Sequence, residues 1–498
     1  MKALSCRRAL LKATTIVAGA TLALGGLALP AHAAPVVNGG AEGSLTIHKY
    51  DKLDTASGVA HNGTQVTVPE GYTALEDVRF AAQKVEDIDL GTNAGWREAS
   101  ELAVAFDAAN VRYADGAAAA VADAGHSLAA AVTQTTNAEG EAFFTSLEVG
   151  QYLITETGYP AGVTPSAPFL VTVPLTDPNN NSQWIYDVHV YPKNAVTTAD
   201  KAVSDADDIK LGDQIDYTIT GQIPNEEIID GYKVVDTLDA KLGYAGTRVS
   251  LSNGTAVTEG THFTVTHNES SNAVTVEFTE AGRVVLAAHH TAEVLVQISA
   301  VVNGVGEISN QAHVYPNRPS FDVEPGQPGG PTTTPEIETK WGGITFQKTD
   351  EENRALSGAR FSVFASETDA RSGANPISLG GKTVFGVNDE GQLTLSGLRY
   401  SDFANGEAVA EGEEGYQSYW LVETEAPAGY ELLAAPVEFT ITAGTTTPGV
   451  DRDIVNVPSN AGFELPLTGG TGTTLLYAAG VLLVGGAVLM AIRSRRNA

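Results

Sequence analysis

Two parts of this chain repeat the same segments in the same order. The matching segments are 45–51 with 344–350, 75–80 with 356–361, and 152–162 with 419–429. Each pair shares several identical residues, among them Lys49 with Lys348 and Glu156 with Glu423. We therefore expect a first and a third domain of common fold. The region between them lacks the repeat and is expected to fold differently.

The repeated segments have the pattern of β-strands. Apolar, β-prone runs such as 169–173, 215–219 and 437–441 recur between turns, and the Asn-Gly pair at 62–63 is typical of a hairpin. The pattern predicts an all-β chain of tandem Ig-like β-sandwiches. We expect the Ala-rich stretch 96–132 to form a helical insertion in the first domain.

Composition and a pair of similar short segments indicate the expected domain boundaries. A Pro- and Gly-rich stretch at 324–335 indicates a linker. Residues 188–192 and 312–316 resemble one another, as if each closes a domain. We expect a first domain over 34–194, a middle domain over 195–320, a linker over 321–340 and a third domain over 341–460.

The N-terminal segment has the features of a secretory signal peptide. Basic residues are followed by an apolar stretch over 16–29, then by Pro30 and the small-residue sequence Ala31-His32-Ala33. We expect a signal peptide over 1–33 with cleavage after Ala33. The alternative is an uncleaved membrane anchor.

The C-terminal segment 465–498 combines three features. It contains a pentapeptide, an apolar run over 475–492 and a basic end. The pentapeptide consists of Leu465, Pro466, Leu467, Thr468 and Gly469. The apolar run is near the minimum length for a membrane span, and the basic end would stay in the cytoplasm. Without the pentapeptide this segment would be an ordinary anchor.

Charge and sulfur content exclude several classes of protein. The net charge of −31 argues against binding to nucleic acid. Cys6, Met1 and Met490 all lie in segments that we expect to be removed, so disulfides cannot stabilise the mature chain. We find no enzyme signature and expect no metal and no cofactor. Acidic residues at 200–208 could hold Ca²⁺, but such a run is more often solvated charge.

Strand alternation places three polar side chains in the core of the third domain. Lys348 shares a face with Ile344 and Phe346, while Glu423 and Asn456 lie on the inward faces of other strands. Burial lowers the pKa of a lysine and raises that of a glutamate, and a neutral amine is a nucleophile. Lys348 could then attack the Asn456 amide with Glu423 as proton shuttle. The alternative is a buried ion pair beside an Asn.

The other two domains offer similar sets. The middle domain has Lys201, Asp236 and Asn310, with Lys210 as an alternative lysine. The first domain has the lysine and glutamate of the repeat, and its amide partner would be Asn194. Lys193 precedes Asn194 and points to the opposite face, where a solvated surface lysine is the ordinary alternative.

These motifs resemble those of a known family. Residues 421–430 resemble the glutamate motif of Cna-B type domains, and the middle domain resembles the Cna-A type. Val190-Tyr-Pro-Lys193-Asn194 resembles the pilin motif, and residues 465–498 resemble a sortase sorting signal. The chain thus resembles the sortase-assembled backbone pilins of Gram-positive bacteria, most closely the major fimbrial subunits of oral Actinomyces.

The resemblance implies a structural role. Lys193 of one subunit would be joined to Thr468 of another, giving a covalent fibre anchored to the cell wall. Isopeptide bonds would link Lys348 to Asn456, Lys201 to Asn310 and, with less support from the family, Lys49 to Asn194. Glu423, Asp236 and Glu156 would promote these single-turnover reactions.

The implied partners are other copies of the chain, a pilin-specific sortase, a housekeeping sortase with peptidoglycan, and a tip pilin. The sequence identifies no receptor. The alternative function is a monomeric, peptidoglycan-anchored surface adhesin. Only Lys193 and its motif distinguish a pilin from such an adhesin.

Overall fold

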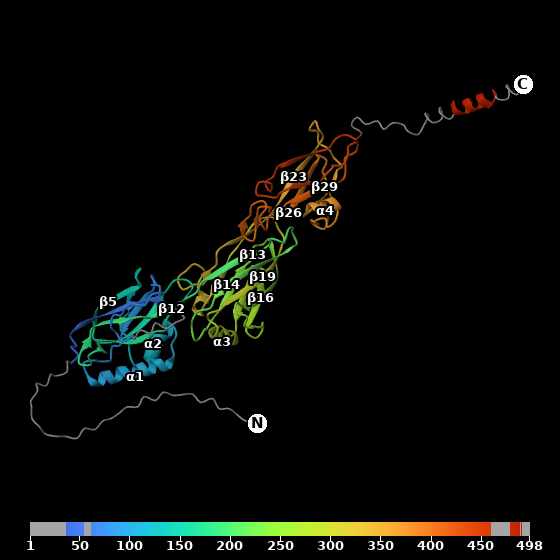
Figure 1. The fold of residues 1–498 in the computed structure, drawn as a ribbon. Coiled ribbons are helices and arrows are strands. Elements are labelled where there is room, and N and C mark those ends of the chain that lie inside the picture. Colours follow the sequence, from blue (N-terminus) through green and yellow to red (C-terminus); the bar gives the residue numbers. More distant parts are fainter. Residues whose placement is uncertain (1–35, 54–60, 460–478, 489, 491–498) are drawn as a thin grey trace, which may run out of the picture.

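Three β-rich domains follow one another along an elongated molecule (Figure 1). The computed structural model describes residues 36–53, 61–459, 479–488 and 490. The expected signal peptide and the pentapeptide with Thr468 lie outside the described residues. Within the described residues, no helix has the length and apolar character that a membrane crossing requires. The predicted all-β fold with tandem sandwiches and a helical insertion is confirmed.

The first domain is a sandwich of two main sheets. One sheet has the order β11 (Asp187–Val190), β1 (Glu42–His48), β5 (Glu141–Glu148). The other has the order β4 (Val132–Thr135), β3 (Arg79–Lys84), β6 (Gly150–Gly158), β8 (Phe169–Val173). Two small sheets pair β2 (Tyr50–Asp51) and β7 (Val163–Thr164) with β12 (Lys193–Val196), and β9 (Leu175–Thr176) with β10 (Trp184–Ile185). Leu45, Phe80 and Phe144 meet in the core between the main sheets.

The helical insertion consists of α1 (Asn93–Ala109) and α2 (Ala114–Asp123). The Thr92 side chain caps the start of α1 by accepting a hydrogen bond from Gly95 N–H. Both helices pack on the second sheet through a separate apolar cluster that includes Leu153 of β6. The insertion ends earlier than predicted, because Val132 already begins β4.

The middle domain is a second sandwich. One sheet has the order β13 (Ala199–Ser204), β14 (Gln214–Gln222), β19 (Glu293–Val302), β16 (Leu242–Leu251). The other has the order β17 (Phe263–Asn268), β18 (Ala273–Phe278), β15 (Lys233–Thr237), β21 (Ala312–Tyr315), β22 (Thr332–Thr333). Helix α3 (Glu280–Ala288) and the 3-10 helix η1 (Pro319–Asp322) complete it. Buried and partly exposed residues alternate strictly along β19, as in a strand with one face on the core.

The third domain repeats the architecture of the first. One sheet pairs β23 (Ile337–Thr349) with β26 (Gln392–Arg399), and β31 (Arg452–Val455) runs parallel to β23, whose first residues also pair with β20 (Gly306–Asn310) of the middle domain. The other has the order β25 (Phe385–Gly386), β24 (Arg360–Phe364), β29 (Tyr419–Glu425), β30 (Val437–Phe439). The remaining elements are α4 (Glu367–Ser372) and the pair β27 (Phe403–Ala404) and β28 (Glu407–Ala408).

Strand β23 connects the middle and third domains. Its first residues pair with β20, its later residues pair with β26, and Trp341 between them is buried in the middle-domain core. The segment 321–340, predicted as a linker, therefore contains β22 and the first residues of β23. Buried Arg399 donates a hydrogen bond to Ala206 O (3.1 Å) of the middle domain, which ties the two domains together, and another to Gly415 O (2.9 Å) within the third domain.

Side-chain and backbone hydrogen bonds also join the first and middle domains. Asn317 Nδ2 donates hydrogen bonds to Val163 O (3.2 Å) and Thr164 Oγ1 (3.0 Å). Gly162 N–H donates to Gly330 O (2.9 Å), within the expected linker. The strand β12 that carries Lys193 leads directly into this junction.

Candidate functional site

The structure brings together the three polar residues of the third domain. Lys348, Glu423 and Asn456 are 1%, 5% and 2% exposed. Asn456 Nδ2 lies 3.0 and 2.9 Å from the two carboxylate oxygens of Glu423. Lys348 Nζ donates a hydrogen bond to Ile454 O (2.7 Å), two residues before Asn456 on the neighbouring strand. In the described part of the chain, no ion pair joins Lys348 to Glu423.

Burial favours a neutral amine at Lys348. It lowers the pKa of Lys348 to about 8, and the Glu423 carboxylate opposes part of that shift. The neutral amine is therefore far more populated near neutral pH than it is for a lysine of ordinary pKa. The Asn456 Oδ1 atom is buried without a hydrogen-bond partner.

The middle-domain residues form a tighter group. Lys201 Nζ donates to Asp236 Oδ2 (2.7 Å), and Asn310 Nδ2 lies 3.4 Å from the same oxygen. Burial lowers the pKa of Lys201 and raises that of Asp236, although their ion pair opposes both shifts. Asp236 Oδ1 and Asn310 Oδ1 are buried and lack hydrogen-bond donors. If the Asp236 carboxyl group carried a proton, its O–H would be the hydrogen-bond donor that is otherwise missing at these two oxygens.

Lys210, the alternative lysine, lies elsewhere. Its Nζ pairs with Asp213 at a partly exposed position, and its backbone bridges to Leu398 of the third domain. Lys201 is therefore the lysine that the fold brings to Asp236 and Asn310.

The first-domain residues are also buried together. Lys49 Nζ is hydrogen-bonded to Glu156 Oε1, and Asn194 Nδ2 donates to Glu156 Oε2 (2.8 Å). Burial lowers the pKa of Lys49, and Glu156 opposes that shift.

Sequence reasoning missed a fourth residue here, Ser166. Its N–H donates to Asn194 Oδ1 (2.6 Å) and its hydroxyl donates to Glu156 Oε1 (2.5 Å). The repeat could not reveal it, because Ser166 lies outside the matching segments.

Lys193 lies on the opposite side of its strand from Asn194, as predicted, but it is half-buried rather than solvated. The segment 66–72 covers it, and Lys193 Nζ lies 5.4 Å from the ring centre of Tyr72. Val66 N–H donates to the Tyr191 hydroxyl (2.8 Å), which holds this segment against the strand. We call this surface, lined by Tyr50, Tyr72, Tyr191 and Lys193, the lysine groove. Loss of solvation in the groove lowers the pKa of Lys193.

The acidic run near residue 205 has a structural role in the junction. Asp205 accepts hydrogen bonds from Thr339 Oγ1 (2.5 Å) at the start of β23 and from Asn405 N (2.6 Å) of the third domain. Burial, together with neighbouring carboxylates, raises the pKa of Asp208 to about 6. Among the described residues, no group of three or more His, Cys, Asp or Glu side chains is placed to hold a metal ion.

Known proteins share this organisation. Family models match residues 40–195 (Gram-positive pilin subunit D1, N-terminal domain), 342–453 (prealbumin-like fold domain) and 457–498 (LPXTG cell wall anchor motif). The chain is 33% identical to fimbrial subunit type 1 of Actinomyces viscosus, with 100% of this chain and 99% of that protein covered.

Two solved structures from Corynebacterium diphtheriae have a similar fold. The major pilin SpaD is 26% identical with a TM-score of 0.65, covering 85% of this chain and 98% of SpaD. The major pilin SpaA is 26% identical with a TM-score of 0.60, covering 83% of this chain and 99% of SpaA. Together with the fimbrial relative aligned along the whole chain, these matches show that the protein belongs to the family of Gram-positive fimbrial subunits, or major pilins.

Proposed function

We propose that this chain is the shaft-forming subunit of a covalent pilus on the cell wall, polymerised by a sortase through Lys193 and Thr468. The observation that carries the proposal is the position of Lys193 in the lysine groove at the end of the first domain. An ordinary surface lysine is fully solvated, whereas this one is held by aromatic side chains and has a lowered pKa.

The proposed linkage is an acyl transfer. A pilin-specific sortase would cleave between Thr468 and Gly469 and hold the Thr468 acyl group as a thioester on its cysteine. The neutral amine of Lys193 in a second subunit would attack the Thr468 carbonyl, forming an amide bond as the thiol leaves. The lowered pKa of Lys193 increases the fraction of neutral amine available for this attack.

Other partners would act at the ends of the fibre. A housekeeping sortase would join the last subunit to peptidoglycan, and a tip pilin would occupy the other end. The anchor motif at residues 457–498 supports attachment to the wall.

Lys193→Ala tests the linkage. Wild-type wall extracts should give a high-mass ladder on an immunoblot, and Lys193→Ala should give monomer that is exported and folded. Lys233→Ala is a matched control, because Lys233 is also half-buried beside aromatic rings and also has a lowered pKa. Polymer in the Lys193→Ala strain would assign the acceptor to another lysine. A single wild-type band would favour the monomeric adhesin.

We further propose that each buried triad forms an isopeptide bond. The lysine amine attacks the Asn side-chain carbonyl carbon, the amide nitrogen leaves as ammonia, and the carboxyl group transfers the proton. Enclosure of the three groups in the core supplies the proximity that such a reaction needs. The structure of the similar SpaA is described as pointing to a modular pilus assembly stabilizing isopeptide bonds. The bonds would be Lys348–Asn456, Lys201–Asn310 and Lys49–Asn194.

A further inference from the structure

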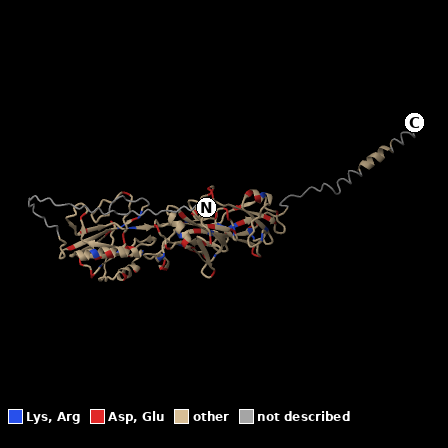
Figure 2. Cartoon of the chain, turned by 90° about the horizontal axis from the view of Figure 1, so that it is seen from below, with Lys and Arg blue, Asp and Glu red and all other residues tan. Residues whose placement is uncertain are grey.

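Two histidines lie next to each other on the first domain, beside the lysine groove. His48 of β1 is only 4% exposed, and its Nε2 atom lies 2.9 Å from Nδ1 of His189 on β11. The Nδ1 atom of His48 is paired with the Glu141 carboxylate of β5 (3.2 Å). Acidic side chains occur along all three domains (Figure 2), yet among the described residues only Glu141 forms an ion pair with either ring. We call His48 and His189 the histidine pair.

The histidine pair is connected to the segment that covers the lysine groove, residues 61–72, which we call the groove cover. His189 N–H donates a hydrogen bond to Gly63 O of the cover (3.0 Å). The Tyr191 hydroxyl accepts the hydrogen bond from Val66 N–H of the cover. Both strand residues that hold the cover thus lie at the end of β11 or directly after it.

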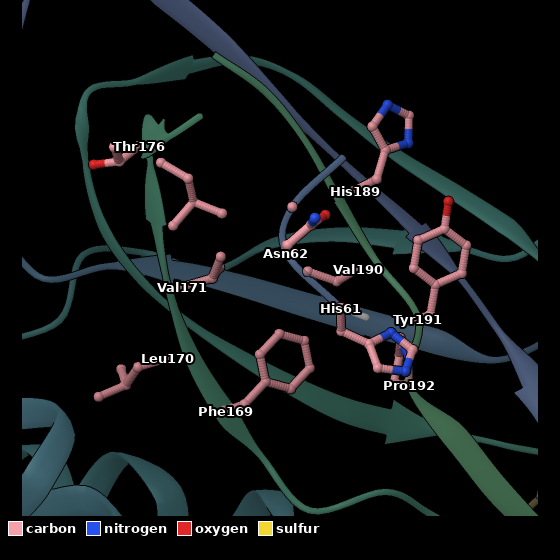
Figure 3. A pocket seen from close by; sticks show the side chains of 12 residues that line it. His61, Asn62, Phe169, Leu170, Val171, Thr176, His189, Val190, Tyr191 and Pro192 are labelled. Carbon is pink, nitrogen blue, oxygen red and sulfur yellow. The ribbon is translucent and has the colours of Figure 1, made fainter. Parts of the chain in front are cut away.

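Ring stacking joins these contacts into one cluster. The Tyr191 ring stacks on His48, with the ring centres 4.6 Å apart and the ring planes at 7° to each other. The centres of the His48 and His189 rings are 5.2 Å apart. His189, Tyr191 and His61 also line one side of a pocket of about 410 Å³ (Figure 3). A change in the histidine pair therefore reaches the cover through Tyr191.

The pair can hold only a limited number of protons. A hydrogen bond between Nε2 of His48 and Nδ1 of His189 needs one nitrogen to donate and the other to accept. The bond is possible when both rings are neutral, and also when one of them is charged. When both rings are charged, two N–H groups point at each other and two like charges lie in contact. Double protonation therefore breaks the pair.

We propose that the histidine pair is an acid-sensitive latch, which holds the groove cover over Lys193 until both rings are protonated and then releases it. His48 and His189 are thereby positioning residues for the reaction of Lys193, acting through Tyr191. This role in the reaction rests on the linkage proposed above. The latch itself does not, because all of its contacts lie within one subunit.

The surrounding groups do not stabilise a second positive charge on the pair. Burial is the largest influence on the pKa of both histidines and lowers both values. Glu141 opposes this shift at both rings, and Asp187, which accepts a hydrogen bond from the Ser44 hydroxyl (2.7 Å), opposes it at His189. The other titratable groups around the pair and the groove are Tyr50, His61, Tyr191 and Lys193. None of these is negatively charged near neutral pH, because burial raises the pKa of both tyrosines.

The direction of the pH dependence follows from these shifts. A released histidine has an ordinary pKa of about 6.5. Well below this pH, the open state binds two protons at the pair, whereas the closed state binds at most one. The closed state is therefore fully favoured above about pH 6.5, and its advantage falls at least about tenfold for each pH unit below that value.

Amide hydrogen exchange in the mature monomer tests the latch. After correction for the intrinsic effect of pH on exchange, protection of the Val66 amide should fall at least about tenfold between about pH 6.5 and about pH 5. Amides of β1 should stay protected, because the sandwich remains folded. His189→Asn places an uncharged amide group near the position of Nδ1 and should abolish the loss of protection. His126→Asn is the matched control, because His126 Nδ1 also pairs with a carboxylate, Asp87 Oδ2 (3.0 Å), away from the groove.

Two further variants keep the test independent of one substitution. His48→Gln removes the other ring of the pair and should also abolish the response to acid. His61→Gln removes the histidine of the cover and should keep the wild-type response. If His61→Gln abolished the response instead, the titrating group would be His61 and the proposed latch would be wrong.

Ladder formation tests the positioning role. With the same sortase at about pH 7.5, wild type and His189→Asn should form ladders at equal rates, because the groove cover is closed in both. At about pH 5 the wild type should be several-fold slower than His189→Asn, because only its cover opens. The pH dependence of the sortase itself affects both chains equally and cancels in this comparison.

The outcomes separate the latch from the linkage. Protection that does not change with pH, or that falls equally in wild type and His189→Asn, would overturn the latch. Equal ladder rates at about pH 5, with the cover shown to be open in wild type, would overturn the positioning role and leave the linkage standing. Absence of any wild-type ladder would overturn the linkage, while exchange in the monomer would still decide whether the latch exists.

Discussion

The cross-link proposed in the third domain can be tested by pulling on single molecules. If Lys348 is joined to Asn456, a force applied between the ends of the domain passes through the bond. The residues between them then carry no load. Glu423→Ala removes the carboxyl group that contacts Asn456, so the bond should not form in this variant.

The expected extension follows from the structure. Lys348 is paired with Ile454 on the adjacent parallel strand β31, so the two ends of the enclosed segment start close together. About 108 residues separate Lys348 from Asn456. At about 3.3–3.6 Å per residue, unfolding of an uncross-linked third domain should add roughly 350–390 Å of chain.

Single-molecule force spectroscopy measures this length directly. Cysteine handles can be placed at the ends of the mature chain, which is expected to contain no other cysteine. Wild type should show no step of this size, and Glu423→Ala should show one. The proposed Lys201–Asn310 bond encloses a segment of almost equal length, so a wild-type trace with the full step would mean that at least one of the two bonds is absent. A variant trace without it would mean that Glu423 is not needed for the bond.

Four further outcomes are expected. Asp236→Ala should leave Lys201 and Asn310 unjoined. Mass spectrometry should then find the variant about 17 Da, one retained ammonia, heavier than its own sequence would be with this bond formed. Denaturant melts should show stability lowered by roughly 4–5 kcal/mol in the loop-entropy model. In refolded chains, the rate of Lys348–Asn456 bond formation should rise about tenfold per pH unit below pH 8 and level off above it. The reason is that the pKa of Lys348 is about 8 and only the neutral amine reacts. A rate that does not change with pH would contradict this reasoning. Arg399→Met should increase bending between the middle and third domains in small-angle scattering while each isopeptide bond still forms, because it removes the hydrogen bond from Arg399 to Ala206 of the middle domain. Ser166→Ala should slow Lys49–Asn194 formation without affecting the other two bonds, as peptide mapping would show.

Strand alternation was sufficient to predict which polar side chains point into each core. A strand has a period of two residues, so Phe346 on the apolar face places Lys348 there as well. Their burial agrees with this argument. The repeat between domains then related Lys49 to Lys348 and Glu156 to Glu423. These features are local, and for that reason they can be read from sequence.

The environment of Lys193 could not be predicted in the same way. Alternation placed it on the outer face, but the segment that covers this face is more than 100 residues away in the sequence. The same limitation applies to the segment 321–340, where Pro and Gly content predicted a linker, and to Trp341, which was predicted to belong to the third domain. The structure has the start of β23 at the end of this segment, and Trp341 is buried in the middle-domain core. Both differences arise from contacts between distant segments.

The three triads differ in their relation to the force on a fibre. A pull would enter at Lys193 and leave toward Thr468, so residues before Lys193 lie outside the loaded path. Bonds at Lys201–Asn310 and Lys348–Asn456 would carry this load past most of the middle and third domains. A bond at Asn194 would instead fix the position next to the acceptor lysine and hold strand β12 against Lys49. Its physical role would be to keep the lysine groove in place while the linkage is made, rather than to bear tension.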